Sequence, residues 1–138
     1  MADITVTAAS VAIQGTGGSL SRVVVGEAVT QGQPGYLNTS DNKYYQCDAD
    51  DTAAKAVCAG VFLTPASTDG YAVLALTGTP ISLGATLTVG QTYVLSGTKG
   101  GIAPIADLAS NDYVTHLGVA STTAILPLDI NVTGVQVP

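Results

Sequence analysis

The sequence is poor in the residues on which most enzymes and nucleic-acid-binding proteins depend. Only 10% of its 138 residues are charged, well below the share of about 25% in ordinary soluble domains, and it has no tryptophan and a single histidine. Its four cations are scattered singly, at Arg22, Lys43, Lys55 and Lys99, and the net charge is −6. Because binding a row of phosphates requires clustered Lys and Arg, we expect no nucleic-acid partner.

Long apolar stretches are also absent. No run reaches the 18 or so consecutive apolar residues of a membrane-spanning helix, so we expect no membrane partner. The first residues, MADITVTAASVAIQ, have neither the basic start nor the continuous apolar core of a signal peptide. The sequence therefore favours a protein that is made and folded in a cytoplasm.

Cysteine is scarce too. Cys47 and Cys58 are separated by neither a CxxC spacing nor the spacing of zinc ligands. Since cytoplasmic thiols stay reduced and cysteine often packs as a small hydrophobic residue, buried free thiols are the expected state. A disulfide between the two is the alternative.

Residues that could perform chemistry are few. His116 lies in YVTHLGVA, where the alternation of apolar residues indicates a strand, so a surface or hydrogen-bonded strand histidine is expected rather than a general base. Asp48, Asp50 and Asp51 resemble the start of a calcium loop, but the DxDxDG pattern and its closing Glu are missing. GTGGS, Gly15–Ser19, lacks the helix and Lys of a phosphate loop and is interpreted as a turn. We predict no catalytic residue, metal ligand or cofactor, and hence no enzyme.

What the sequence has in abundance is the pattern of short strands. Hydrophobic residues make up 46% of the chain, and apolar runs alternate with turns rich in its 16 glycines. The one helical segment is DADDTAAKAVCAG, in which Asp50 or Asp51 can cap one or two turns around Thr52–Val57. The predicted fold is all-β: a jelly-roll-like β sandwich or small barrel with at most one short helix.

Part of the sequence occurs twice. GEAVTQGQ, Gly26–Gln33, returns 58 positions later as GATLTVGQ, Gly84–Gln91, and the pair Gly60-Val61 returns at the same distance as Gly118-Val119. Such an offset predicts a duplicated unit, and so two related halves. Chance reuse of a common glycine-turn-strand phrase is the alternative.

Two structural expectations follow from the duplication. Gly32-Gln33 and Gly90-Gln91 should occupy equivalent turns, and Tyr36 and Tyr93 should point from equivalent strands.

Within a single domain, residues 1–25 form an N-terminal β arm or the first strands, and residues 26–138 form the β sandwich. The arm is either a simple first strand or an open edge that adds to a neighbour's sheet.

Several segments resemble a known family. ADITVTAASV, GEAVTQGQPGYLN, DADDTAAKAV and GTKGGIAPIADLASNDYVTHLGVASTTAILPLDI together are similar to the small decoration, or cement, proteins of tailed-phage heads, which include the jelly-roll cement protein of short-tailed Bordetella phages. The resemblance covers most of the chain and rests on glycine and turn placement. It implies a protein that binds the outside of an assembled capsid, across seams between major capsid proteins. It transfers no individual site residue, because these families lack a sharp site motif.

The expected function is therefore structural. A non-enzymatic protein on the outer surface of the virion, made in the cytoplasm of a host bacterium, would bind the major capsid protein and itself, preferably as a dimer. Sparse charge suits such packing, because interface cores are depleted of charged residues. The alternative is a tail or fibre adhesin module that binds a host-surface ligand, for which Tyr36, Tyr44 and Tyr45 could gather at one end.

Overall fold

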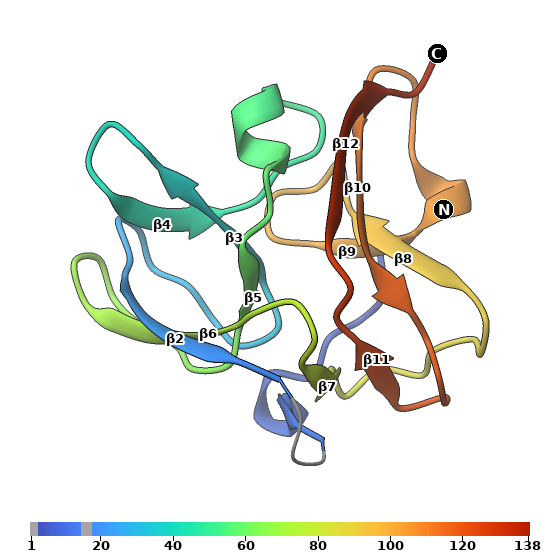
Figure 1. Cartoon of the computed structure of the whole chain (residues 1–138), viewed down its shortest axis with the longest axis horizontal. Coiled ribbons are helices and arrows are strands. Elements are labelled where there is room, and N and C mark those ends of the chain that lie inside the picture. The colour runs from blue at the N-terminus through green and yellow to red at the C-terminus, as the bar shows by residue number, and fades with distance from the viewer. Residues whose placement is uncertain (1–2, 15–17) are drawn as a thin grey trace.

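The protein is built almost entirely from short antiparallel strands (Figure 1). The computed structural model describes residues 3–14 and 18–138. The strands are β1 (Ala12–Ile13), β2 (Leu20–Val24), β3 (Pro34–Asn38), β4 (Lys43–Gln46), β5 (Gly60–Phe62), β6 (Tyr71–Ala75), β7 (Pro80–Ser82), β8 (Thr92–Leu95), β9 (Ile102–Pro104), β10 (Tyr113–Val119), β11 (Ile125–Pro127) and β12 (Asn131–Gln136). The all-β prediction is confirmed.

Helical structure is limited to single turns. Within the described residues there is no α-helix, and the 3-10 turns are η1 (Ala8–Ser10), η2 (Ala53–Ala56) and η3 (Ile105–Asp107). The helix expected around Thr52–Val57 is present as η2. Its expected cap was wrong, because Thr52 is the N-cap residue and makes no side-chain capping bond, while Asp51 is bound to Lys55.

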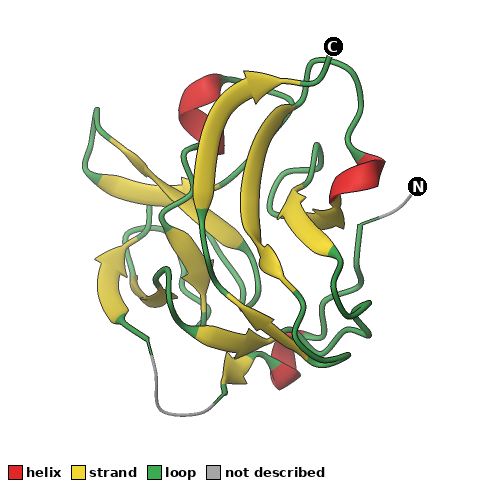
Figure 2. Cartoon of the chain, turned by 45° about the vertical axis from the view of Figure 1, so that its right-hand side comes forward, coloured by secondary structure: helices red, strands yellow, loops and turns green. Residues whose placement is uncertain are grey.

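The strands form three open antiparallel sheets, as expected of a sandwich rather than of a closed barrel. The five-stranded sheet has the order β2-β6-β5-β3-β4 and lies at the left of Figure 1. The four-stranded sheet, β12-β10-β8-β9, lies at the right, and the three-stranded sheet, β1-β7-β11, lies below it (Figures 1 and 2). We call β2–β6 the first half and β7–β12 the second half.

Strand pairing shows that the two halves repeat one topology. In the hairpin β3–β4, Leu37 pairs with Tyr44, and in β8–β9 Leu95 pairs with Ile102. The members of the second pair stand 58 positions after those of the first. The pairing of β3 with β5 recurs in the same way between β8 and β10, with Gly35 opposite Gly60 and Tyr93 opposite Gly118. The prediction of two related halves is confirmed.

The repeated glycines occupy equivalent turns, as predicted. Gly32 and Gly90 have φ angles of 85° and 82°, in the left-handed region that glycine adopts without strain. Their amides donate to the carbonyls of Phe62 and Ala120, at 2.8 Å and 2.9 Å. These acceptors are again 58 positions apart. The sequence offset therefore carries over to individual hydrogen bonds.

The tyrosine part of the same expectation was only half right. Tyr36 and Tyr93 do lie on the equivalent strands β3 and β8, but Tyr93 is the counterpart of Gly35, and the counterpart of Tyr36 is Val94. Because successive side chains of a strand point to opposite faces, the two tyrosines lie on opposite faces of their sheets. Tyrosine identity was thus a poorer guide to equivalence than the glycine spacing.

The second half is shorter than the first in the region that corresponds to β6. Val23 of β2 pairs with Ala72 of β6, and Ile81 of β7, 58 positions after Val23, pairs with Leu126 of β11. Leu126 stands 54 positions after Ala72, so the second half lacks four residues between β10 and β11. The single strand β6 is matched there by β11 followed by β12, which pair with β7 and β10 in turn.

One face of the first sheet joins the two halves. Pro34, Val61 and Ala75 are paired across β3, β5 and β6, and therefore share a face with Tyr36. We call these four residues the joining face. Tyr36, Val61 and Ala75 are buried in one apolar cluster, the larger core, with Tyr93, Leu95, Ile102 and Leu117 of the second half. The opposite face of the first sheet encloses a smaller core built around Phe62 and Leu74.

The two halves close their sheet edges differently. In the first half the edge strands approach directly, because Gly26 donates its amide to the carbonyl of Tyr44 at 3.0 Å. The corresponding stretches of the second half are instead bonded to the N-terminal arm: Ile4 donates to Ile102 at 2.9 Å and Thr7 donates to Leu83 at 3.0 Å. Residues 4–13 therefore lie within the chain's own fold.

Gly60 and Gly118 allow neighbouring backbones to approach closely at equivalent places. A Cβ atom on Gly60 would lie 2.2 Å from the carbonyl oxygen of Ala75, and one on Gly118 would lie 2.2 Å from that of Pro127. We predict that Gly60→Ala and Gly118→Ala each lower the free energy of unfolding by about 1–3 kcal/mol, measured by urea denaturation. Gly97→Ala is the control, since its Cβ would meet only a side-chain oxygen of Asp112 at 3.0 Å. Wild-type stability of both test variants would contradict the prediction.

The arm should contribute to stability through its inward-facing side chains. Ile4 and Val6 pack against the larger core. Replacing both by Ser is expected to lower the free energy of unfolding by about 2–4 kcal/mol, because apolar surface is returned to water. The control is the double change of Thr5 and Ala9, both exposed, to Ser. Equal stability of the two double variants would show that the arm is only loosely attached.

Candidate functional site

The residues singled out for chemistry do not assemble into a catalytic or metal centre in the described part of the chain. No group of three or more His, Cys, Asp or Glu side chains there is arranged to hold a metal ion. The described residues also include no helix that is long and apolar enough to cross a membrane. Most of GTGGS, residues 15–17, lies outside the described residues; Ser19, at its end, accepts a hydrogen bond from Thr79. The surfaces of the molecule are therefore the candidates for function.

The acidic segment at Asp48–Asp51 is a structural link between the halves. The Asp48 carboxylate accepts the Asp50 amide at 3.2 Å, and burial raises the pKa of Asp48. Between them, Ala49 donates to the carbonyl of Ser96 at 3.1 Å and accepts the amide of Tyr113 at 2.7 Å. These backbone bonds tie the segment to the second half. Its carboxylates accompany this link and do not converge on a common point.

All four cations are engaged by neighbouring groups. Lys43 and Lys55 contact Asp69 and Asp51 at 2.5 Å, and Lys99 contacts Glu27 at 2.6 Å. The fourth, Arg22, lies 4.1 Å above the ring of Tyr71, within the range of a cation–π interaction. Exposed ion pairs add little stability. Because each of the four cations is engaged by a neighbouring group, they form no concentrated positive surface.

The sheet edges are mostly covered. Glu27 accepts the outward-pointing amide of Gln46 on β4, and Ile4 covers β9. The expectation that the N-terminal strand leaves an edge open does not fit residues 4–13, which are bonded to their own chain. Strand β12 is fully exposed, but its register against β10 breaks, and Gly134 there has a φ of 70°. Such bulges hinder pairing with another strand.

The tyrosines proposed for ligand stacking are occupied within the fold. The rings of Tyr36 and Tyr45 are 6.1 Å apart and tilted by 31°. Tyr36 is buried, and Tyr44 packs on the other side of the sheet against the smaller core. The hydroxyl of Tyr45 donates to Asp41, and this bond raises the pKa of Tyr45 to about 12. These three side chains do not form an exposed aromatic platform.

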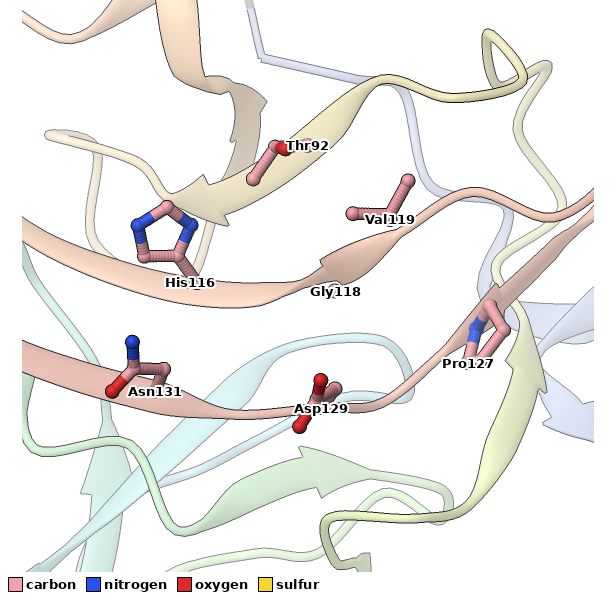
Figure 3. A pocket seen from close by; sticks show the side chains of 7 residues that line it. All are labelled: Thr92, His116, Gly118, Val119, Pro127, Asp129 and Asn131. Carbon is pink, nitrogen blue, oxygen red and sulfur yellow. The ribbon is translucent and has the colours of Figure 1, made fainter.

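A shallow hollow of about 370 Å³ lies on the outer side of β8 and β10 (Figure 3). His116 and Val119 of β10 stand on one side of it, and Asp129 and Asn131 stand on the other. The amide of Asp129 donates to the carbonyl of Leu117 at 2.8 Å, which fixes the connection between β11 and β12 that carries the carboxylate. The lining residues are Thr92, His116, Gly118, Val119, Pro127, Asp129 and Asn131. One histidine and one carboxylate are its only titratable groups.

A second hollow of about 400 Å³ lies between the end of β3 and η2. Leu37 and Val57 in its wall are exposed apolar side chains, and Lys55 is its only charged residue. The first hollow holds a hydroxyl, an imidazole and a carboxylate at Thr92, His116 and Asp129, but no hydrogen bonds link these side chains as nucleophilic catalysis requires, and the second hollow has no histidine or carboxylate. Both are better suited to contact with another surface.

Sequence reasoning found His116 but not the hollow around it. The alternating pattern placed His116 in a strand, and it does lie half-buried in β10. Asp129 and Asn131 were not singled out, because the β10–β12 pairing that opposes His116 to Asn131 is not apparent from local sequence. The available signal was the offset of 58, which makes His116 the counterpart of Cys58.

Comparison with known proteins adds no assignment. A scan of the chain against protein-family models finds no match, and a search of curated proteins finds no significant similarity. Function must therefore be argued from the residues and their arrangement.

Cys47 and Cys58 are free and buried, as expected of structural thiols. Burial raises the pKa of Cys47 well above its usual range, so at pH 8 that thiol is protonated and unreactive. We predict that the native protein reacts slowly with Ellman's reagent at pH 8, and that two thiols per chain react once guanidinium unfolds it. Rapid reaction without denaturant, or fewer than two thiols after unfolding, would contradict this.

Proposed function

We propose that the chain is a non-enzymatic decoration protein that binds the outside of a phage capsid and stabilises it. The observation that carries the proposal is the character of the surface. Every cation is engaged, and large apolar side chains stand exposed on both halves, including Leu20, Tyr71, Val119 and Val135. Such a surface can be covered by protein without stripping water from many unpaired charges.

The architecture suits mechanical work. The halves share a continuous apolar core, and backbone hydrogen bonds join them at Ala49. A protein that spans a seam between capsid subunits must transmit tension without separating internally, and this joint resists separation. The resemblance of the sequence to cement proteins of tailed-phage heads points to the same role. The major capsid protein is the proposed partner, and the proposed unit is a homo-oligomer, preferably a dimer.

Stabilisation of the shell need not require tight binding by each molecule. A protein that binds the assembled shell but not its separated subunits stabilises the shell by mass action. An oligomer that contacts neighbouring subunits adds multivalency, because its second contact forms at a high effective concentration. Broad polar and apolar contact repeated over the lattice is then sufficient.

A second candidate is an adhesin module of a tail or fibre. The hollow beside His116 favours it, because Thr92, Asp129 and Asn131 provide hydrogen-bonding groups of the kind that sugar hydroxyls use. Against it, none of the six tyrosines lines that hollow. The adhesin function would require binding to the host surface rather than to the shell.

Deleting the gene from the phage that encodes it separates the two functions. For a decoration protein, we expect mutant heads that assemble but lose DNA on heating or chelation at milder conditions than wild-type heads. Adding the purified protein should restore resistance, and it should co-sediment with mutant heads. Mutant heads as heat-stable as wild type, together with failed attachment to the host, would replace this proposal with the adhesin function.

A further inference from the structure

The duplication makes one surface of the second half equivalent to a buried surface of the first. At an offset of 58 positions, Pro34, Cys58 and Val61 correspond to Thr92, His116 and Val119. At the shorter offset of β6 and β11, Ala75 corresponds to Asp129. All four first-half residues are buried. Their four counterparts line the hollow of Figure 3, and we call them the open face.

The difference in burial is large. Val61 is fully buried, whereas 49% of its counterpart Val119 is exposed. The joining face is covered by the second half, whereas none of the described residues covers the open face in the same way; Val94, the counterpart of Tyr36, is buried and is not part of the open face. The two halves thus form equivalent surfaces from the same strand geometry. The surface of the first half packs against the rest of the chain, whereas that of the second half remains exposed.

The residues of the open face differ from their buried counterparts in one consistent way. Proline, cysteine and alanine are replaced by threonine, histidine and aspartate, and only the valine is kept. Polar groups around one apolar side chain suit a surface that meets water before association and a partner afterwards. Asp129 is its only carboxylate, so in a chain of net charge −6 this is a region where two molecules can approach with little repulsion.

We propose that the open face is the self-association surface, on which a second copy of the chain packs its own open face about a twofold axis. This deepens the homo-oligomer of the proposed function and rests on it. The inner faces of both sheets are buried in the two cores, so a second copy cannot supply one of those to cover the hollow. Its open face is the equivalent surface still uncovered. A twofold contact of a surface with itself is the commonest arrangement of homodimers.

The polar groups of the open face support this pairing. His116 and Asp129 lie on opposite sides of the hollow (Figure 3). A twofold axis running along the hollow places each side of one copy against the other side of its partner, so that an imidazole faces the half carrying Asp129 and Asn131. Val119 stands on the same side of the hollow as His116 and therefore faces that same half of the partner. Complementary polar groups across an interface fix its register and disfavour other partners.

Sedimentation equilibrium of the purified full-length chain tests the proposal. The wild type should dimerise, and Val119→Asp should raise the dimer dissociation constant by about tenfold or more, because each dimer gains two carboxylates that face the side of the partner carrying Asp129. His116→Asp should act in the same direction. The control is Leu20→Asp, since Leu20 is also 49% exposed but lies on β2 of the first half, and it should dimerise like wild type. Urea denaturation checks that each variant is folded; if Val119→Asp is not, His116→Asp decides.

Two outcomes would overturn the proposal. One is a wild-type chain that stays monomeric at the highest concentrations reached. The other is a wild-type oligomer whose dissociation constant is unchanged by the open-face substitutions, since the oligomer then uses another surface. Normal dimerisation with loss of shell binding in Val119→Asp is a case of the second outcome and would assign the face to the capsid. Dimerisation is measured without shells. A chain that fails to dimerise can therefore still bind the capsid, and a chain that dimerises can still fail to bind it, so the two proposals are tested separately.

Discussion

The packing of the joining face against the interior of the second half is the contact on which the rest of the structure depends. The first half has only a small core of its own, and the two halves become one body because Tyr36, Val61 and Ala75 enter a cluster that continues into the second half. The long chain segment between β4 and β5 can then run between the halves and exchange backbone hydrogen bonds with both. Disrupting this packing would expose apolar surface on two sheets at once.

Glycine made much of this fold predictable. The spacing of Gly32 and Gly60 returns in the second half because these positions meet backbone demands that no other residue satisfies at low cost: a left-handed turn at Gly32 and the close approach of another strand at Gly60. Side chains in between were free to change, which is why Tyr36 and Tyr93 misled. Helix position followed from composition, but its cap did not, because Lys55 competes for Asp51.

The surface was predictable only in its chemistry. Composition showed that charge is sparse, yet the partners of Lys43 and Lys99 lie 26 and 72 positions away in the chain and meet them only through the fold. The hollow beside His116 was hidden for the same reason, since β10 and β12 are separate segments of the sequence and become neighbours only in the fold. Both required the register of strand pairing, which depends on tertiary packing.

The N-terminal arm has a consequence for how the chain reaches its native state. Thr7 is made about 76 residues before Leu83, and Ile4 about 98 residues before Ile102, to which they are bonded. During synthesis the first half can fold as soon as β6 has emerged, but the N-terminal arm must wait for the second half before its backbone groups find their partners. Contacts so distant in sequence are slow to form. The nascent chain thus carries an N-terminal segment with unpaired backbone groups until Ile102 has been made, and this segment joins the fold late although it is made early.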